Sequence, residues 1–362
     1  MDLKSYLMLM VECGASDLYL SAGAKPNIRI EGKNTPAADA ILTPEQVRDL
    51  AYSAMDESQR QIFEQELELN LGLALEGVGR FRTNIYHQRG QVGMVVRFIK
   101  ADVPSIQDLG LPEVLQDLIM KRQGLILVVG ATGSGKSTTL AAMLDHRNTN
   151  ATGHIVTVED PIEYVYEYKQ SVMTQRELGV DTLSYERALA SALREAPDVI
   201  MIGEIREADT MRYAMHFAET GHLCLATLHA GNCTQAVERI VNFFPKSGQP
   251  QLLQDLSLEL RAIIAQRLVP GRDGRRVAVV EYMLNTPGIA DLIRRGDISE
   301  LRQFMDKPSA TGARSFDRAL VELCKQGKIS AENAVSYADS EHDVRLAIDY
   351  ADSHGEPFDG YL

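Results

Sequence analysis

The pattern of apolar and polar positions changes about one third of the way along the chain of 362 residues. Over residues 1–100, several short stretches alternate apolar and polar positions with period two, and helical patterns interrupt them. The alternating stretches that predict strands are "DLYLSA", "NIRIEG", "LELNLGLALEG", "GRFRTNIYHQ" and "QVGMVVRFIK", the last three as an antiparallel meander. Helices are predicted at about 2–13 and over "LTPEQVRDLAYSAM", with Thr43 as N-cap and Pro44 at the first helical position. Residues 1–100 therefore predict a small α+β domain.

Residues 101–112 carry two prolines and a glycine with little periodicity, which predicts a linker. Over residues 113–284, continuous apolar runs rich in β-formers alternate with helical stretches. The apolar runs are "LILVVG", "HIVTVE", "VIMIGE" and "LCLATLH", and the helical stretches are "KSTTLAAMLDHR", "SYERALASALRE" and "ADTMRYAMHFAETG". Such alternation predicts an α/β domain with a parallel sheet covered on both faces. The stripe "LLQDLSLELRAIIAQRLV" predicts a core helix within it.

Residues 285–362 are mainly helical in pattern and end in "DSHGEPFDGYL", which predicts a helical segment followed by a loose tail. The chain length agrees with two or three units at roughly 100–200 residues per domain.

Composition narrows the function classes without selecting one. The net charge of -13 disfavours broad binding to nucleic acid, which needs clustered Lys and Arg. The four cysteines show no metal-site spacing, and the start of the chain predicts an amphipathic helix and not a signal peptide. No apolar run approaches the roughly 18 residues needed to span a membrane. A cytoplasmic protein with free thiols and no transmembrane segment is expected.

A phosphate-binding loop is the clearest chemical motif. "GATGSGKST" fits G-x-x-x-x-G-K-[ST], with a β-rich run before it and a helical run after it. In such a loop, backbone N–H groups and the helix N-terminus face the phosphates of a nucleotide such as ATP. Lys136 is expected to reach the β- and γ-phosphates, and the Ser137 hydroxyl to bind Mg²⁺. The predicted nucleotide-binding residues of the loop are Gly130, Ala131, Thr132, Gly133, Ser134, Gly135, Lys136, Ser137 and Thr138.

Acidic residues follow two of the predicted core strands. In "VIMIGE", Gly203 occupies the position where an aspartate usually precedes the glutamate, so only Glu204 remains. In "TVEDPIEY", Glu159 and Asp160 end a strand at the edge where ligands bind in α/β sheets. Pro161 turns the chain there, and the turn is expected to direct Glu163 toward the γ-phosphate. The alternative interpretation is an acidic turn on the surface.

Four blocks in order carry a resemblance to a known family: "GATGSGKST", "TVEDPIEY", "APDVIMIGEIRE" and "TGHLCLATLHA". They resemble the Walker A, Asp box, Walker B and His box of the type II secretion and type IV pilus ATPase superfamily, closest to the PilT/PilU family of retraction ATPases. The likeness covers residues 1–350, and "APDVIMIGE", "HLCLATLHA" and "NTPGIADLIR" are more similar to the PilU branch. The chain departs from the PilT branch at "GIADLIRRG", where Gly288 and Ala290 replace an expected Ala and Arg.

The resemblance implies a fold and a function. It implies an N-terminal PAS-like domain, a RecA-like P-loop ATPase core and a C-terminal helical extension. It implies a homo-oligomer, a hexameric ring with ATP between the two domains, that hydrolyses ATP with Mg²⁺ to drive or assist type IV pilus retraction in twitching motility. The implied partners are a PilT-type ATPase and the inner-membrane pilus platform protein, with no nucleic acid. The implied location is the cytoplasmic side of the inner membrane at the pilus base.

The resemblance also assigns roles to single residues. Glu163 matches the general base that activates water, and Glu204 matches the Walker B glutamate near Mg²⁺ and the water. Glu159 and Asp160 match acids that hold Mg²⁺ through water. The other matches are His229 near the γ-phosphate, the earlier His-box residue His222, the phosphate-binding arginines Arg82 and Arg97 of the N-terminal domain, and Arg206 as a further candidate.

Each of these roles has a plainer alternative. His222 and His229 also fit histidines satisfied within a core, and Arg82 and Arg97 fit the solvated face of their strands. At the level of function, the alternatives are a RecA-like nucleic-acid translocase and a nucleotide-gated scaffold with little motor activity. The acidic charge counts against the first, and the intact set of hydrolytic residues counts against the second.

Overall fold

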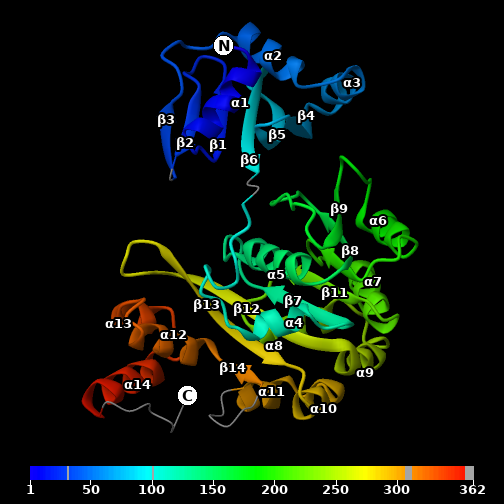
Figure 1. Ribbon diagram of the computed structural model, residues 1–362, viewed down its shortest axis with the longest axis vertical. Helices are drawn as coiled ribbons and strands as arrows, with labels where there is room; N and C mark the ends of the chain where they lie inside the picture. The colour runs from blue at the N-terminus through cyan, green and yellow to red at the C-terminus, as the bar shows by residue number, and fades with distance from the viewer. Residues whose placement is uncertain (31, 100–101, 306–311, 355–362) are drawn as a thin grey trace. The chain divides into compact units, whose positions relative to one another are not determined.

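The computed structural model describes residues 1–30, 32–99, 102–305 and 312–354, which fold into two compact units (Figure 1). The first unit contains Met1–Asp102, together with Pro161–Glu167 and Glu177–Leu183. The second contains Val103–Asp160, Tyr168–Arg176 and Ser184–Leu362. Residues 355–362 of the predicted tail, and residues 31 and 100–101 at the ends of two predicted strands and of the linker, lie outside the described residues.

The first unit is built on a six-stranded antiparallel sheet of order β3-β2-β1-β6-β5-β4. Its strands are β1 Asp17–Ser21, β2 Asn27–Ile30, β3 Lys33–Pro36, β4 Glu68–Leu75, β5 Gly79–Gln88 and β6 Gln91–Ile99. Its helices are α1 Leu3–Glu12, α2 Pro44–Ser53 and α3 Glu57–Glu66. The meander of β4, β5 and β6 and the helix starts α1 and α2 confirm the sequence predictions, whereas β3 and α3 were not predicted.

The alternation seen in the sequence divides the first sheet into two faces. Along β5, Phe81, Thr83 and Ile85 are buried, while Arg82 and Asn84 on the other face stay partly exposed. The helices cover the apolar face, and Thr43 caps α2 by accepting a hydrogen bond from the Gln46 N–H. The polar face of the sheet is therefore not part of the hydrophobic core of this unit.

The second unit is built on an eight-stranded sheet of order β14-β13-β12-β7-β11-β10-β8-β9. The run from β12 to β8 is parallel, and β13 and β14 are added antiparallel at one edge. Its strands are β7 Gly124–Val129, β8 Gly153–Glu159, β9 Ser171–Glu177, β10 Val199–Ile202, β11 Leu223–Leu228, β12 Leu260–Pro270, β13 Arg276–Leu284 and β14 Ala313–Arg314. All six residues of β7 are buried, which explains why the central strands appear in the sequence as continuous apolar runs.

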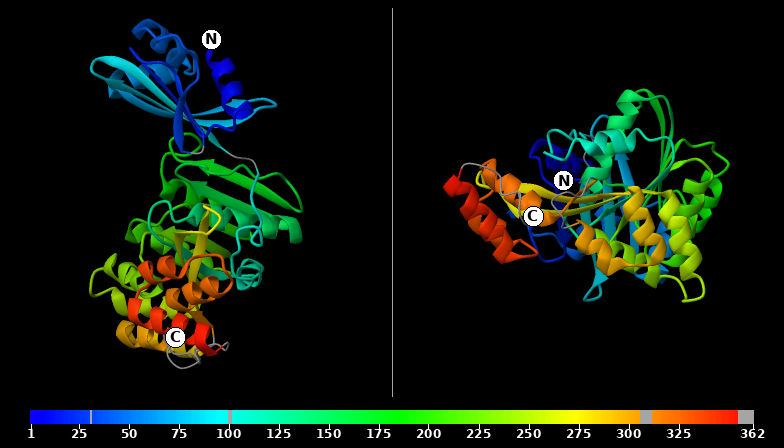
Figure 2. Two further views of the ribbon diagram at one scale, coloured as in Figure 1. Left: turned by 90° about the vertical axis from the view of Figure 1, so that its left-hand side faces the viewer. Right: turned by 90° about the horizontal axis from the view of Figure 1, so that it is seen from below.

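Helices flank this sheet and form the C-terminal group. They are α4 Val114–Ile119, α5 Lys136–Asn150, α6 Tyr185–Ala192, α7 Ala208–Glu219, α8 Cys233–Asn242, α9 Gln249–Glu259, α10 Pro287–Arg295, α11 Ile298–Met305, α12 Phe316–Lys325, α13 Ala331–Ser336 and α14 Glu341–His354. Figure 2 shows α12, α13 and α14 grouped beside the ribbon formed by β12 and β13. No helix in the described ranges is both long and apolar enough to cross a membrane.

One element prediction in this unit is wrong. The stripe at residues 252–269 was expected to form one core helix, but α9 ends at Glu259 and β12 begins at Leu260. The unbroken buried run from Ala262 to Ala265 pairs with β7 on one side and β13 on the other. Burial on both faces erases the periodicity that separates a strand from a helix in sequence. The strands β9, β13 and β14 and the helix α8 were also not predicted.

Candidate nucleotide site

The phosphate loop connects the buried strand β7 to the N-terminus of α5, as the motif predicts. Gly133 and Gly135 adopt positive φ angles of 77° and 92°, conformations that favour glycine and let the loop curl over the helix end. The Lys136 ammonium donates hydrogen bonds to the main-chain oxygens of Gly130 at 2.9 Å and Ala131 at 3.0 Å. Burial lowers the pKa of Lys136, and the nearby Glu204 opposes that shift. A charged donor therefore lies inside the loop.

Two hydroxyls of the loop differ in their surroundings. Ser137, in the first turn of α5, is exposed. The Ser134 hydroxyl is buried and has no hydrogen-bond partner in the described part of the chain. An unsatisfied buried hydroxyl in such a loop fits a site that a polar ligand completes.

Glu204 lies at the carboxyl edge of the parallel strands, two residues after the end of β10. His229, which follows β11, places its Nε2 atom 3.1 Å from Glu204 Oε1. On the other side, Arg206 Nη2 and Nε lie 2.8 Å and 2.9 Å from Glu204 Oε2. The hydrogen bond to Glu204 is also the main reason that the pKa of Arg206 is raised. The structure thus brings three predicted site residues into one cluster, with the glutamate held on both sides.

Gly203 explains why this strand has no aspartate before its glutamate. A Cβ atom at Gly203 would lie 3.0 Å from the Tyr185 hydroxyl, 3.1 Å from Glu159 Cα and 3.2 Å from the Val158 oxygen. A side chain at this position would therefore require β8 or Tyr185 to shift by a few tenths of an ångström. Burial raises the pKa of Tyr185, and the charge of Asp160 adds to the shift. Tyr185 was not singled out in the sequence, because nothing in the sequence places it beside the Walker B strand.

The stretch "TVEDPIEY" is divided between the two units, with the boundary between Asp160 and Pro161. Glu159 is buried, and its Oε1 atom accepts a hydrogen bond from the Thr157 hydroxyl at 2.7 Å. Asp160 is exposed, and its Oδ2 atom lies 3.8 Å from Arg206 Nη1. The two acids therefore have different environments: one is held within the sheet, and the other faces solvent at its carboxyl edge.

His222 lies away from this cluster. It precedes β11, at the opposite end of the strand from His229. Its Nδ1 atom lies 3.0 Å from the Thr220 hydroxyl and 3.1 Å from the Phe217 oxygen, and its ring packs edge-on against Phe217. In this chain the contacts of the His222 Nδ1 atom and ring are with its own neighbours, Thr220 and Phe217.

The remaining candidates belong to the first unit. Arg82, Arg97 and Asp17 are cross-strand neighbours in one row of the first sheet, on its polar face. Arg97 Nε lies 2.8 Å from Asp17 Oδ1, and this contact is the main reason that the pKa of Arg97 is raised. The exposed Glu163 also contributes to that shift. Two arginines directly opposite each other repel, and carboxylates offset part of that repulsion: Asp17 and Glu163 act on Arg97, and Glu177 acts on Arg82. Two guanidinium groups side by side on one face are a donor set for an anion.

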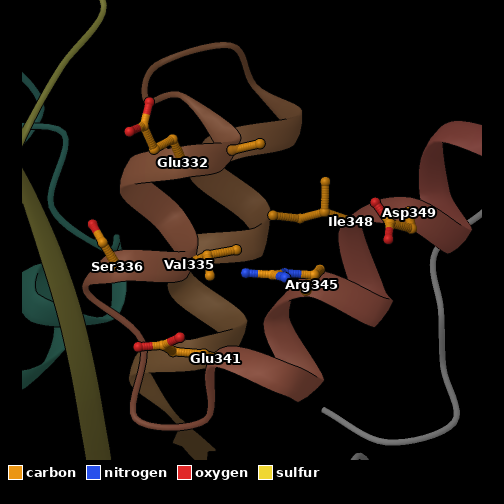
Figure 3. Close-up of a pocket in the computed structure, with 8 residues that line it drawn as sticks. Glu332, Val335, Ser336, Glu341, Arg345, Ile348 and Asp349 are labelled. Carbon is orange, nitrogen blue, oxygen red and sulfur yellow. The ribbon is translucent and has the colours of Figure 1, made fainter.

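Among the cavities of the described part of the second unit, two bear on this assignment. One of about 400 Å³ adjoins the Glu204 cluster and is lined by His229 and by one side of α8 as far as Asn242. Another of about 460 Å³ lies between α13 and α14, with Arg345 and Ile348 facing Val335 (Figure 3). It has no glycine loop, and three carboxylates, those of Glu332, Glu341 and Asp349, line it. The second cavity therefore lacks the chemistry of a phosphate site.

A magnesium ion fits this site only in association with a nucleotide. In the ranges that the structure describes, no three His, Cys, Asp or Glu side chains are grouped to hold a metal ion. Mg²⁺ usually keeps several waters and binds through one or two side chains plus substrate phosphates. The exposed Ser137 and the carboxylate edge with Glu204 match that kind of site.

Comparison with known proteins identifies the family. The family model described as "Type II/IV secretion system protein" matches residues 65–285. The chain is 50% identical to the type IV pilus ATPase PilU of Pseudomonas aeruginosa over 96% of this chain and 91% of that protein. It is 41% identical to the retraction ATPase PilT of the same organism, over 92% and 97% of the two chains. This chain belongs to the PilT/PilU family of type IV pilus ATPases. It is an ATPase of the secretion superfamily, as the sequence predicted.

Solved structures agree with that assignment. The crystal structure of the pilus retraction motor PilT with bound ADP matches with a TM-score of 0.88 and 41% identity, over 95% of this chain and 98% of that one. The ATPase DotB of Legionella pneumophila matches with a TM-score of 0.80 and 25% identity, over 97% of both chains. The predicted α/β fold class, with an N-terminal β-rich domain, an ATPase core and C-terminal helices, is confirmed. Nucleotide binding is supported, and neither the translocase nor the scaffold alternative is favoured.

Proposed function

We propose that this chain is an ATP-hydrolysing motor of type IV pilus retraction and that it works as a hexamer with a PilT-type ATPase. The observation that carries the proposal is the Glu204 cluster beside an intact phosphate loop in a chain 50% identical to PilU. A positioned carboxylate next to a cationic phosphate cradle is the arrangement that phosphoryl transfer to water requires.

The chemistry follows from the contacts of Lys136 and Glu204. When the phosphates of ATP enter the loop, the Lys136 ammonium exchanges the Gly130 and Ala131 oxygens for the β- and γ-phosphate oxygens. Glu204 orients the attacking water, while His229 and Arg206 hold its carboxylate in place. Ser137, Glu204 and Asp160 would hold Mg²⁺, with Glu159 acting through water. The ion supplies charge neutralisation to the transferred phosphoryl group.

The first unit carries the other residues to which we assign a role. Arg82 and Arg97 would bind the phosphates, and Glu163 would act as general base or share that role with Glu204. The row in which Arg82 and Arg97 face each other supports this assignment, because an anion relieves their repulsion. His222, satisfied by Thr220 and Phe217, is proposed as a structural residue of this chain.

Replacing Arg97 with alanine is expected to raise the KM for ATP by about tenfold, because a charge-assisted contact to phosphate is lost. Arg82→Ala should act in the same direction. The control is Arg48→Ala, which removes the same charge from α2, where the guanidinium stacks 5.0 Å over the Tyr52 ring. Steady-state ATPase kinetics of the three variants test the assignment. A KM for Arg97→Ala equal to that of the control would contradict it.

We base the proposed partners and oligomeric state on the family to which the chain belongs. We propose peripheral attachment at the inner-membrane base of the pilus, through a platform protein, without nucleic acid. The α10 segment supports an assisting role, because Gly288 and Ala290 depart from the PilT pattern and Asp291 pairs with Arg294 and Arg295 on its surface. Such a motor would gain activity from its PilT-type partner.

Light scattering and ATPase rates, measured with and without a PilT-type ATPase, test this proposal. Six copies of the 40.0 kDa chain are expected to give a particle of about 240 kDa. The ATP turnover of the mixture should exceed the sum of the separate rates. A monomer at all concentrations with ATP present would refute the ring. Strong stimulation by single-stranded DNA at physiological salt would favour the translocase.

A further inference from the structure

Strand β12 pairs with β7, the strand that precedes the phosphate loop, and one side chain of β12 contacts the loop. Ala265 of β12 is in register with Val129, the last residue of β7, so Gln266 lies level with the start of the loop. Gln266 is 3% exposed, and its Oε1 atom accepts a hydrogen bond from the buried Thr139 hydroxyl at 2.5 Å. Thr139 belongs to the first turn of α5, so this bond joins β12 to the helix that follows the loop.

The two end glycines of the loop both pack against Gln266. A Cβ atom on Gly130 would lie 2.6 Å from the main-chain oxygen of Gln266, and one on Gly135 would lie 2.7 Å from its Nε2 atom. Real Cβ atoms are not found at such distances. The loop therefore touches Gln266 at its first and last glycine, and α5 touches it through Thr139.

The next residue of the same strand points away from the loop. Arg267 Nη2 lies 2.7 Å from Asp339 Oδ1, and its guanidinium lies 3.9 Å from the centre of the Phe316 ring. Its Nη1 atom donates a hydrogen bond to the Tyr337 oxygen at 3.1 Å. Successive side chains of a strand point to opposite faces, so Gln266 serves the loop while Arg267 anchors the C-terminal helices.

We propose that Gln266 is a positioning residue of the nucleotide site. It fixes the two ends of the phosphate loop and the first turn of α5, so that the backbone N–H groups converge on the phosphates. This inference rests on the nucleotide-binding role of the loop and adds a residue outside the four sequence blocks. The main-chain oxygen of Gln266 packs against Gly130, and its side chain acts on the nucleotide through Gly135 and Thr139.

The direct experiment measures binding of fluorescent ADP to the full chain carrying Gln266→Ala. The dissociation constant is expected to rise about tenfold, the effect of losing one buried hydrogen bond and its packing. The rate at saturating ATP should change less than threefold, because Gln266 touches no reacting atom. A purely structural role would lower the melting temperature and leave the dissociation constant unchanged.

Arg267→Ala is the matched control, because it perturbs the same strand from the opposite face. It is expected to lower the melting temperature with less than a twofold change in ADP affinity. Thr139→Val is the second variant. It removes the hydroxyl that Gln266 accepts from while leaving the glutamine in place, and it should weaken ADP binding about fivefold.

The outcomes separate the possibilities. Weakened binding in Gln266→Ala and Thr139→Val, but not in Arg267→Ala, supports the proposal. Unchanged ADP affinity in a folded Gln266→Ala protein overturns it, and so does an equal loss in Arg267→Ala. If Gln266→Ala does not fold, Thr139→Val decides alone, and unchanged affinity there overturns the proposal. Failure of the nucleotide site itself would appear separately, as absence of ADP binding by the unmodified chain.

Discussion

The Glu204→Gln variant is expected to hydrolyse ATP at least about a hundredfold more slowly than the parent at saturating ATP. Glutamine has nearly the same shape and still accepts a hydrogen bond, but it has no negative charge to orient and polarise the attacking water. Because Glu204 makes no hydrogen bond to the phosphate loop, and Ser137 and Asp160 remain to hold Mg²⁺, the affinity for ATP should stay within about threefold. The His229 and Arg206 contacts at 3.1 Å and 2.8 Å then lose their anionic partner.

Single-turnover kinetics and equilibrium nucleotide binding together test this prediction. The matched control is Glu207→Gln, which makes the same charge change three residues later, on an exposed residue at the start of α7. The control should keep the parent rate. A Glu204→Gln enzyme that hydrolyses ATP near the parent rate would move the catalytic role to another acid, with Glu163 the first candidate.

The sequence could predict the elements whose burial is one-sided or whose motifs are local. The meander of the first unit and the start of α2 follow from period-two alternation and from Thr43 and Pro44. The central strands follow from apolar runs. The segment from Leu260 to Pro270 could not be assigned, because its role as a strand depends on pairing with β7, which is distant in sequence.

For the site as well, some features could be located from the sequence and others required the fold. The phosphate loop and Glu204 could be located from sequence because each is a short motif at the end of a strand. The contact between Glu204 and His229 requires the order of the strands, with β11 lying between β7 and β10. The reason for Gly203 required the position of Tyr185, which starts a separate helix. The row that contains Arg82 and Arg97 required the register between β5 and β6.

Other residues looked equivalent in the sequence but lie in different places in the fold. His222 and His229 flank the same strand and looked equivalent in sequence, but β11 places them at its two ends. Only His229 reaches the carboxyl edge, where the loop and Glu204 lie. The acids of "TVEDPIEY" looked like one group, yet Glu159 and Asp160 belong to the second unit and Glu163 belongs to the first.

Lys136→Ala is expected to weaken ATP and ADP binding by roughly a hundredfold, because it removes the only cationic side chain that the loop itself contributes. The ammonium is partly buried and bonded to Gly130 and Ala131 oxygens, so it is already positioned inside the loop before phosphate binds. Lys136→Arg should not restore full affinity, since a planar guanidinium does not fit a cradle shaped for a compact charge. The matched control is Lys121→Ala, which removes the same charge from an exposed residue that precedes β7, at the opposite end of that strand. Titration with fluorescent ADP, with melting temperatures as a check on folding, measures the difference. Equal affinity in the Lys136→Ala and Lys121→Ala proteins would show that the loop is not part of the nucleotide site.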